Sequence, residues 1–266
     1  MITCHLMGGL GNQLFEIYTT LSYAIQSNQS FAFLNVKQLG DRFTYWDSFF
    51  KRLRPCLISS IPHFKVIREV DFTYRELPIL HDCVLHGYFQ SYKYFQDKRE
   101  EIHKYIGIDH LKSEFLNKLG LSLDASVSMH FRLGDYKFYP QCHPILSYEY
   151  YKKALQVFEG KYTIYYFCEQ EDTDYVERMI YTLRGDFPEL TFVSAGFDWS
   201  DWEQLLWMSC CRHNIIANSS FSWWGAYLNE HTDKIVCYPS VWFGPAMIKD
   251  LKDLFPPKWL KIECKS

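Results

Sequence analysis

Several features that mark other classes of protein are scarce in this 266-residue chain. None of its nine cysteines forms a C-x-x-C pair, so a zinc site with paired ligand spacing is not indicated. The chain has 28 basic and 31 acidic side chains and a formal net charge of −3, which disfavours nucleic acid as a partner. No apolar run reaches the roughly 18 residues of a membrane span, so we expect none.

An export signal is also missing, because the strand-like segment Ile2–Leu6 follows Met1 without a basic region or an apolar core. The cysteines lie mostly in apolar segments, and the neighbours Cys210 and Cys211 are too close for an unstrained bridge. Free, buried thiols of this kind are typical of a reducing compartment. These observations predict a cytoplasmic protein.

Short apolar strands that alternate with helical periodicity are present throughout, without repeats or low-complexity linkers. The expected strands are Ile2–Leu6, Phe31–Leu34, Val84–Gly87, Val127–Phe131, Tyr162–Phe167, Asn214–Ala217 and Lys234–Tyr238. Such alternation predicts an α/β fold with helix-covered parallel sheets, whose ligands bind outside the carboxyl ends of the strands. A polar, leucine-punctuated stretch at 108–126 predicts two halves, 1–124 and 125–266, that face each other.

The first place where chemistry is expected is the glycine loop from Met7 to Gln13, between a strand and a helix. Gly9 and Gly11 permit close approach of a ligand to the backbone, and the helix start favours anions. Asn12 and Gln13 add amide groups for sugar hydroxyls. The dinucleotide and P-loop patterns are both incomplete here, so a tight strand-to-helix turn is an equally good interpretation.

The second place is the end of the strand Val127–Phe131, where His130, Arg132 and Asp135 follow in close succession. Alternation puts His130 and Arg132 on one side of the strand. An arginine suits a two-point grip on a diphosphate. Asp135 either accepts a proton from an acceptor hydroxyl or orients Arg132, and the alternative for the whole segment is a salt-bridged strand end.

The third place is the turn after Asn214–Ala217, which runs from Asn218 to Gly225 into a helix. Its polar residues meet the exposed backbone N–H groups of a helix start, which makes a neutral phosphate cradle. We expect Ser219 to Ser222 to face a ligand and the tryptophans Trp223 and Trp224 to pack in the core.

Together these segments resemble the α-1,2-fucosyltransferase family, inverting glycosyltransferases of family 11. The family motifs G-G-L-G-N-Q-[ML]-F, H-x-R-x-G-D-Y and N-S-S-F-S-W-W-G correspond to Gly8–Phe15, His130–Tyr136 and Asn218–Gly225. Weaker similarities lie at His86–Ser91 and at Leu254–Pro256. The likeness covers nearly the whole chain in order.

The resemblance implies a GT-B-like fold of two Rossmann-type halves facing across a cleft, with the acceptor on the first and the GDP-sugar on the second. It implies inverting transfer of L-fucose from GDP-β-L-fucose to a galactose-containing or other glycan, without a metal. Arg132 would contact the diphosphate with support from His130. The remaining donor contacts implied are Gly9, Gly11, Asn12, Gln13, Asn218, Ser219, Ser220, Phe221 and Ser222.

The chain departs from the family pattern in three places. Leu133 replaces a frequent second arginine, and the acidic stretch from Cys168 to Asp172 replaces a Ser-Asp-Asp-like sequence. An aspartate that often precedes the third motif is absent, and Glu203 is the candidate to replace it at the guanine. For the catalytic base we expect Asp135, then His143, then Glu16.

Three alternatives remain open from the sequence. The chain could transfer another GDP-deoxysugar such as rhamnose, because the motifs do not decide the pocket shape. It could be a non-catalytic glycan-binding module, which its 18% aromatic content would suit. Asp172-Thr173-Asp174 matches the D-x-D pattern of metal-dependent transferases, but Asp172 also stands where a helix cap is expected, and we prefer that interpretation.

Overall fold

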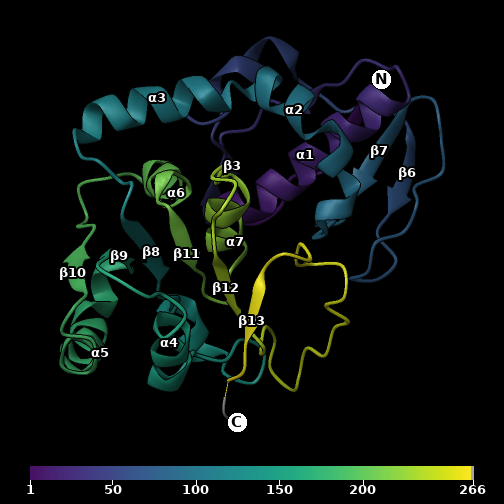
Figure 1. The fold of residues 1–266 in the computed structure, drawn as a ribbon. Helices are drawn as coiled ribbons and strands as arrows, with labels where there is room; N and C mark the ends of the chain where they lie inside the picture. The colour runs from purple at the N-terminus through teal and green to yellow at the C-terminus, as the bar shows by residue number, and fades with distance from the viewer. Residues whose placement is uncertain (265–266) are drawn as a thin grey trace. The chain divides into compact units, whose positions relative to one another are not determined.

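The structure is a computed structural model and describes residues 1–264 (Figure 1). The chain forms two compact units: Met1–Ser113 with Asp250–Pro256, and Glu114–Lys249 with the residues from Pro257 onward. The sequence predicted halves that meet at residues 124 and 125, whereas the change of unit falls inside helix α3 (Ile108–Leu119). The assignment of the halves to acceptor and donor stays a prediction.

Three parallel strands form the main sheet of the first unit, in the order β1-β7-β6. The strands of this unit are β1 Ile2–Cys4, β2 Phe33–Leu34, β3 Gln38–Leu39, β4 Arg42–Phe43, β5 Leu57–Ile58, β6 Lys65–Arg68 and β7 Cys83–His86. Its helices are α1 Leu10–Gln26 and α2 Arg99–Ile106, with 3-10 turns η1 Lys51–Cys56, η2 Tyr92–Tyr94 and η3 Gln96–Lys98. Helix α1 is buried along most of its length, and polar side chains such as Gln13 and Glu16 are among those that it buries.

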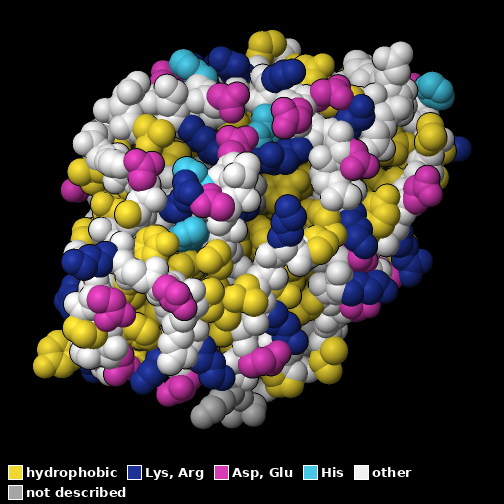
Figure 2. Space-filling model, in the orientation of Figure 1, with side chains coloured by type: hydrophobic (Ala, Val, Ile, Leu, Met, Phe, Trp, Pro, Cys, Tyr) yellow, Lys and Arg dark blue, Asp and Glu magenta, His cyan; other side chains and the backbone are white. Residues whose placement is uncertain are grey.

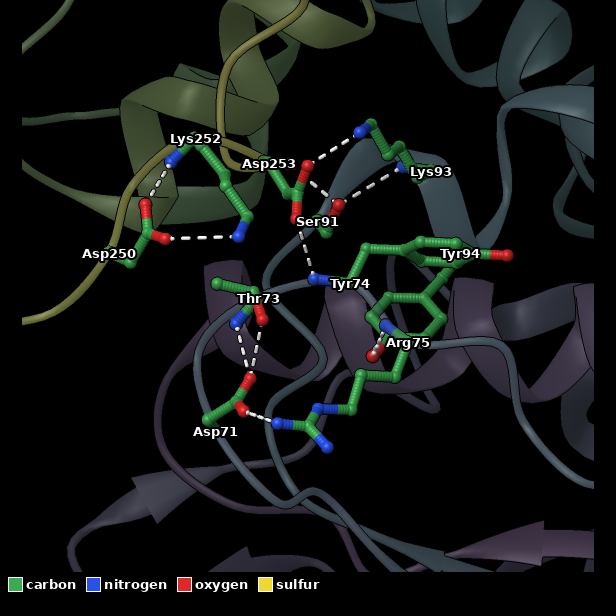
Figure 3. A network of polar contacts seen from close by, with 10 residues as sticks. All are labelled: Asp71, Thr73, Tyr74, Arg75, Ser91, Lys93, Tyr94, Asp250, Lys252 and Asp253. Carbon is green, nitrogen blue, oxygen red and sulfur yellow. Dashed lines mark hydrogen bonds and ion pairs between the residues drawn. The ribbon is translucent and has the colours of Figure 1, made fainter.

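Residues 250–256 return to the first unit and are held there by a polar network (Figure 3). The buried carboxylate of Asp253 accepts the backbone N–H of Tyr74 at 3.0 Å and the ammonium of Lys93 at 2.5 Å. The Asp253 carbonyl accepts the hydroxyl of Ser91 at 2.6 Å. A single residue of the returning segment thus satisfies three donors of this unit.

Six parallel strands form one sheet in the second unit, in the order β10-β9-β8-β11-β12-β13. Their bounds are β8 Ser126–His130, β9 Thr163–Phe167, β10 Thr191–Ser194, β11 His213–Ile215, β12 Val236–Pro239 and β13 Leu260–Ile262. Numbered along the chain, the order reads third, second, first, fourth, fifth, sixth, which is the Rossmann order. The direction of winding reverses between β8 and β11, where Met129 lies opposite Ile215.

Helices cover both faces of this sheet (Figure 1). They are α4 Tyr148–Leu155, α5 Thr173–Asp186, α6 Asp201–Cys210 and α7 Ser220–Tyr227, with the 3-10 turns η4 Gly134–Phe138 and η5 Gln170–Asp172. Met129 and Tyr166 point into the core formed with α4 and α5. Tyr165 and Phe167 point the other way and contact Trp207 of α6. The unit is therefore a doubly wound α/β sheet, as the alternating sequence pattern predicted.

None of the nine cysteines, all of which lie in the described part of the chain, is joined in a disulfide. Burial raises the pKa of the thiols of Cys211 and Cys237 to about 12. Within residues 1–264 no helix combines the length and the apolar character that crossing a membrane requires. On the face drawn in Figure 2, basic and acidic side chains are interspersed, in keeping with the small net charge.

Candidate functional site

Two of the three predicted segments meet at the point where the second sheet reverses its winding. Strands β8 and β11 are hydrogen-bonded neighbours and run parallel, so their carboxyl ends lie side by side. The chain leaves β8 through 131–136 and leaves β11 through 216–221. In sheets of this order, ligands bind at the reversal, outside the carboxyl ends of these strands. The site of the second unit is therefore built on this edge.

Arg132 is the cation of this edge, and its guanidinium is held between two carboxylates. One side pairs with Glu169, which follows β9, and the other pairs with Asp135 in turn η4. The guanidinium carbon also lies 5.2 Å from the ring centre of Tyr136. Burial alone would lower the pKa of Arg132, but Glu169 and Asp135 raise it, so the charge is permanent. The side chain is 19% exposed and is thus open to an anionic ligand.

His130 lies beneath this arginine as a neutral imidazole. Its side chain is buried, and its ring lies 5.6 Å from that of Phe221 in α7. Burial lowers the pKa of His130 to about 3, with Arg132 adding to the effect. Its Nδ1 is buried without a hydrogen-bond partner among the described residues. His130 therefore cannot donate a proton as an imidazolium near neutral pH.

The start of helix α7 lies beside residues 131–136, the turn that carries Arg132 and is called the arginine turn below, and is hydrogen-bonded to it. Ser219 caps the helix, with its hydroxyl accepting the N–H of Phe221 at 3.3 Å. The hydroxyl of Tyr136 donates to the carbonyl of Asn218 at 2.9 Å. The Asn218 amide donates to the carbonyls of Pro144 and Trp242, while its Oδ1 is buried with no partner among residues 1–264. A permanent cation thus stands next to a helix start, which is an arrangement that binds phosphate.

The serines of this turn differ in where they point. Ser220 is half-buried at the first position of α7. Ser222 is buried, and its hydroxyl accepts the N–H of Ala217 at 3.2 Å, so it closes the turn from inside. Trp223 and Trp224 are fully buried in the core, as expected. The ligand roles of Ser219, Ser220, Phe221 and Ser222 stay predictions.

An acidic stretch after β9 completes the surroundings of Arg132. The carboxylates of Glu169, Glu171 and Asp172 lie within 4.8 Å of one another, close enough to hold a metal ion. Asp172, however, is buried, accepts the N–H of Gly134 at 2.8 Å and pairs with Lys137. It stands at the cap position of α5 but supports turn η4 instead of the helix, so the cap interpretation holds for its position only.

From the sequence, Glu169 was noticed as part of a departure from the family pattern, and Asp172 also as part of a D-x-D pattern and a helix-cap candidate. Their contact with Arg132 and turn η4 follows from the pairing of β8 with β9, which places the two strand ends together. The acidic run directly after a buried strand did not indicate these contacts.

His143 lies on the outer side of the arginine turn. Its ring stacks on Tyr136 with 4.5 Å between ring centres. Burial lowers the pKa of His143, and Arg132 adds to this while Asp135 opposes it. Its Nδ1 has no partner among the described residues. The structure therefore brings His143, Asp135 and Arg132 into one neighbourhood, as expected for candidate base and phosphate ligands.

Glu203 is used at the start of helix α6. It forms a capping box with Ser200 and accepts the ammonium of Lys118 at 2.6 Å. Burial raises the pKa of Glu203, but the bonds from Lys118 and Ser200 outweigh it and lower the value. Its predicted contact with guanine stays a prediction.

In the first unit, the glycine loop lies at the carboxyl end of β1. Gly8 has a φ of +68°, and a Cβ there would lie 2.5 Å from the Asn12 amide, so only glycine fits. Asn12 accepts the Gln90 amide at 2.9 Å. Gln13 is buried and donates to the carbonyls of Gly8 and Phe43. The loop is internally braced, and the ligand roles of Gly9, Gly11, Asn12 and Gln13 stay predictions.

Glu16 was the third candidate for the base and is fully buried in the first unit. One carboxylate oxygen accepts the Met7 N–H at 2.9 Å, and the other has no partner among the described residues. Burial raises the pKa of Glu16 well above its ordinary value, and the nearby Glu69 adds to this. Burial thus favours the protonated form of Glu16. We expect this side chain to affect the stability of the fold and not to accept the proton of a glycan hydroxyl.

The sequence profile described as Glycosyl transferase family 11 matches residues 59–263. An alpha-1,2-colitosyltransferase of Escherichia coli is 23% identical over 99% of each chain. The human galactoside alpha-(1,2)-fucosyltransferase 1 is 27% identical over 85% of this chain and 65% of its own.

Among solved structures, the Escherichia coli ADP-heptose LPS heptosyltransferase II is similar with a TM-score of 0.53 and 12% identity. The match covers 98% of this chain and 89% of that one. This likeness concerns the fold, and it confirms the GT-B-like α/β class with Rossmann-type halves that the sequence predicted.

Proposed function

Since the chain belongs to glycosyl transferase family 11, we propose that it transfers L-fucose from GDP-β-L-fucose to a glycan hydroxyl in α-1,2 linkage, with inversion. One observation carries the proposal: Arg132 and the start of helix α7 lie together where the winding of the second sheet reverses. A cation and the positive end of a helix are what a departing diphosphate needs.

In this mechanism the acceptor oxygen attacks the anomeric carbon from the face opposite the diphosphate. The bond from that carbon to the β-phosphate oxygen breaks, and GDP leaves with the bonding electrons, its charge balanced by Arg132. The acceptor proton passes to a carboxylate, for which we propose Asp135. Its oxygen pairs with Arg132 in this structure, and a bound diphosphate would replace that pairing and free Asp135 to act as a base.

No metal is required in this scheme, because Arg132 and the helix start supply the positive potential at the leaving group. Glu169 and Asp172, the residues that could hold an ion, are already paired with Arg132 and Lys137. A cation at the acidic stretch would have to displace two side chains that the site itself provides.

The donor sugar is the part of the proposal that needs the sharpest test. One relative that aligns over 99% of both chains is an alpha-1,2-colitosyltransferase. Colitose is L-fucose without its 3-hydroxyl. A site that hydrogen-bonds this hydroxyl rejects the deoxy sugar strongly, whereas a site without such bonds discriminates weakly. GDP-colitose and GDP-rhamnose are therefore the donors to compare with GDP-fucose.

The experiment is a panel of donors, GDP-fucose, GDP-colitose, GDP-rhamnose, GDP-mannose, a UDP-sugar and a TDP-sugar, each with and without a galactose-containing acceptor. We expect transfer from GDP-fucose, and NMR of the product to show an α-1,2 linkage. Preferred transfer from GDP-colitose or GDP-rhamnose would change the donor and keep the enzyme class. Binding of free oligosaccharide, with neither GDP binding nor transfer, would identify a glycan-binding module and overturn the proposal.

A further inference from the structure

Two uncovered aromatic rings follow the arginine turn directly. Phe138 is 78% exposed and Tyr139 is 61% exposed, and they come three and four residues after Asp135. Single exposed aromatics are common on proteins. Here two exposed aromatics are adjacent in the sequence and lie beside a candidate active site, so the way in which their backbone is held matters.

The backbone that carries these rings is fixed on both sides. Before them, Lys137 pairs with the buried Asp172 and the hydroxyl of Tyr136 binds the α7 turn. After them, the N–H groups of Cys142 and His143 both donate to the Tyr139 carbonyl, at 2.9 and 2.8 Å. The backbone on both sides of the two rings is therefore held by hydrogen bonds and an ion pair, so Phe138 and Tyr139 project from a well-supported segment.

A second loop of the same unit, residues 243–246, packs against this segment and is hydrogen-bonded to it. Gly244 donates its N–H to the Cys142 carbonyl at 2.8 Å, and Ala246 donates to the Gln141 carbonyl at 2.9 Å. A Cβ on Gly244 would lie 2.3 Å from the Gln141 oxygen, so the loops are in close contact. Phe243 of this loop lies against His143, with 5.9 Å between ring centres. The rings of Tyr136, His143 and Phe243 thus contact other rings of the protein, whereas those of Phe138 and Tyr139 are exposed to an outside ligand.

The distance of these rings from Asp135 indicates which kind of ligand they are expected to contact. A 3-10 turn rises by about 2 Å per residue, so Phe138 lies roughly 6 Å along the turn from Asp135, about the width of one sugar ring. Aromatic faces stack on the apolar C–H face of a pyranose in the same way as they pack on other apolar surfaces. The cation that suits a phosphate, Arg132, is less exposed than these two rings and contacts the ring of Tyr136.

We propose that Phe138 and Tyr139 bind a pyranose ring of the acceptor glycan and so determine which glycans the enzyme accepts. This rests on the proposed transferase function. A membrane surface fits the patch poorly, because its nearest basic side chain, Lys137, is already paired with Asp172.

The test compares Phe138→Ala and Tyr139→Ala with the unchanged protein. We expect the KM for the acceptor to rise about tenfold or more in each variant, with GDP affinity by calorimetry within about twofold of the original. Tyr139→Phe keeps the ring and is expected to keep the acceptor KM. Tyr181→Ala is the matched control, since Tyr181 is 79% exposed on α5 of the same unit and outside the site.

Other outcomes would overturn the proposal. An unchanged acceptor KM in both alanine variants would show that no acceptor sugar rests on these rings. A parallel loss of GDP affinity would assign them to the donor, and a change of oligomeric state in size-exclusion chromatography would assign them to a second copy of the chain. GDP-fucose hydrolysis without acceptor, measured on the original protein, tests the transferase function separately.

Discussion

At the scale of single residues, the site depends on a guanidinium that two carboxylates already hold. Replacing Arg132 by lysine keeps the charge but loses the planar, two-point contact with a diphosphate. We expect Arg132→Lys to lower kcat with GDP-fucose by about 10²-fold or more, while thermal unfolding changes little. Arg212→Lys, at a surface pair with Asp233, is the control. Near-original kcat in Arg132→Lys would remove Arg132 from the leaving group.

If the donor diphosphate binds Arg132 as proposed, Glu169 competes with it for the same guanidinium. In Glu169→Gln, Arg132 loses a partner that the diphosphate must displace, so GDP should bind more tightly. Because the pair is partly exposed, the expected gain is about two- to fivefold, within the range of exposed ion pairs. Calorimetry with GDP measures it, and Glu171→Gln in the same stretch should change nothing. A tenfold weaker GDP affinity would show that Glu169 orients Arg132 for the ligand.

Asp135 is distinguished from Glu169 by the quantity that its replacement should change, which is the rate of transfer and not the affinity for GDP. We expect Asp135→Asn to lower kcat and to remove the acidic limb of the pH–rate profile, with GDP affinity kept. His130 cannot supply that limb near neutral pH, because burial lowers its pKa to about 3. If Asp135→Asn mainly weakens GDP binding, Asp135 acts on Arg132, and His143 becomes the next residue to test as the base.

At the scale of elements, the turn η4 is held by the buried carboxylate of Asp172 from the start of α5. Asp172→Asn can still accept the Gly134 N–H but no longer attracts Lys137, so the turn should loosen. We expect a higher KM for the donor with a smaller change in kcat. Asp174→Asn, the second acid of the D-x-D pattern, should leave both constants nearly unchanged.

The same pattern gives a test of the metal-free mechanism. If Asp172 serves the turn and not an ion, transfer should persist in excess EDTA at nearly full rate. Complete loss of activity with EDTA, restored by Mn²⁺ or Mg²⁺, would make the acidic stretch a metal site.

How well the elements could be predicted from the sequence depended on where each strand lies in its sheet. Strands β8, β9 and β12 have apolar neighbours on both sides and were expected within two residues of their observed ends. The strands β3, β4, β5, β6, β10 and β13 were not expected, and each of them pairs with another strand on one side only. Edge strands expose polar residues to solvent, as in Thr191–Ser194 of β10, so they lack the apolar run that marks a buried strand.

The site was predictable where one segment carries its chemistry and not where two segments meet. His130 and Arg132 share one motif and the turn at 218–221 has another, so the sequence alone singled them out as candidates. The contact of Glu169 with Arg132 and that of Tyr136 with Asn218 depend on strand order, which local patterns do not contain. Sequence periodicity states that a strand ends, and only the fold states what lies beside that end.

At the scale of the whole molecule, stability should depend on pH through Glu16 and His130. Glu16 has a raised pKa in the folded state, so the folded chain holds a proton that the unfolded chain releases above pH about 4.5. The free energy of unfolding should therefore fall as pH rises above this value. His130 acts in the opposite sense, since its lowered pKa makes stability fall as pH drops below about 6.5.

Glu16→Gln separates these two effects, because glutamine keeps an acceptor for the Met7 N–H and cannot ionise. We expect its melting temperature to exceed that of the original protein at pH 8, by about 2–4 °C for each kcal/mol removed, and to gain less at pH 5. Thermal unfolding at several pH values measures this. Equal shifts at pH 5 and pH 8 would mean that Glu16 is not a buried acid that must ionise.

The returning segment 250–256 gives a further test of stability. Asp253→Ala leaves the Tyr74 N–H and the Lys93 ammonium without the buried carboxylate that accepts both, which should cost about 1–3 kcal/mol of unfolding free energy. Asp250→Ala, a change at an exposed neighbour in the same segment, should cost little. Chemical denaturation compares the two, and equal losses would show that the network around Asp253 contributes nothing specific.

This excursion of the chain also limits how such a protein can be recombined. The sequence passes between the two units at three places, near residues 113, 249 and 256. A graft that exchanges one unit between relatives by a single junction near residue 113 would supply the segment 250–256 from the wrong parent, and with it the residue that serves Tyr74, Lys93 and Ser91. Hybrid transferases built on this fold should therefore carry these seven residues with the first unit, as a separate insert in the second.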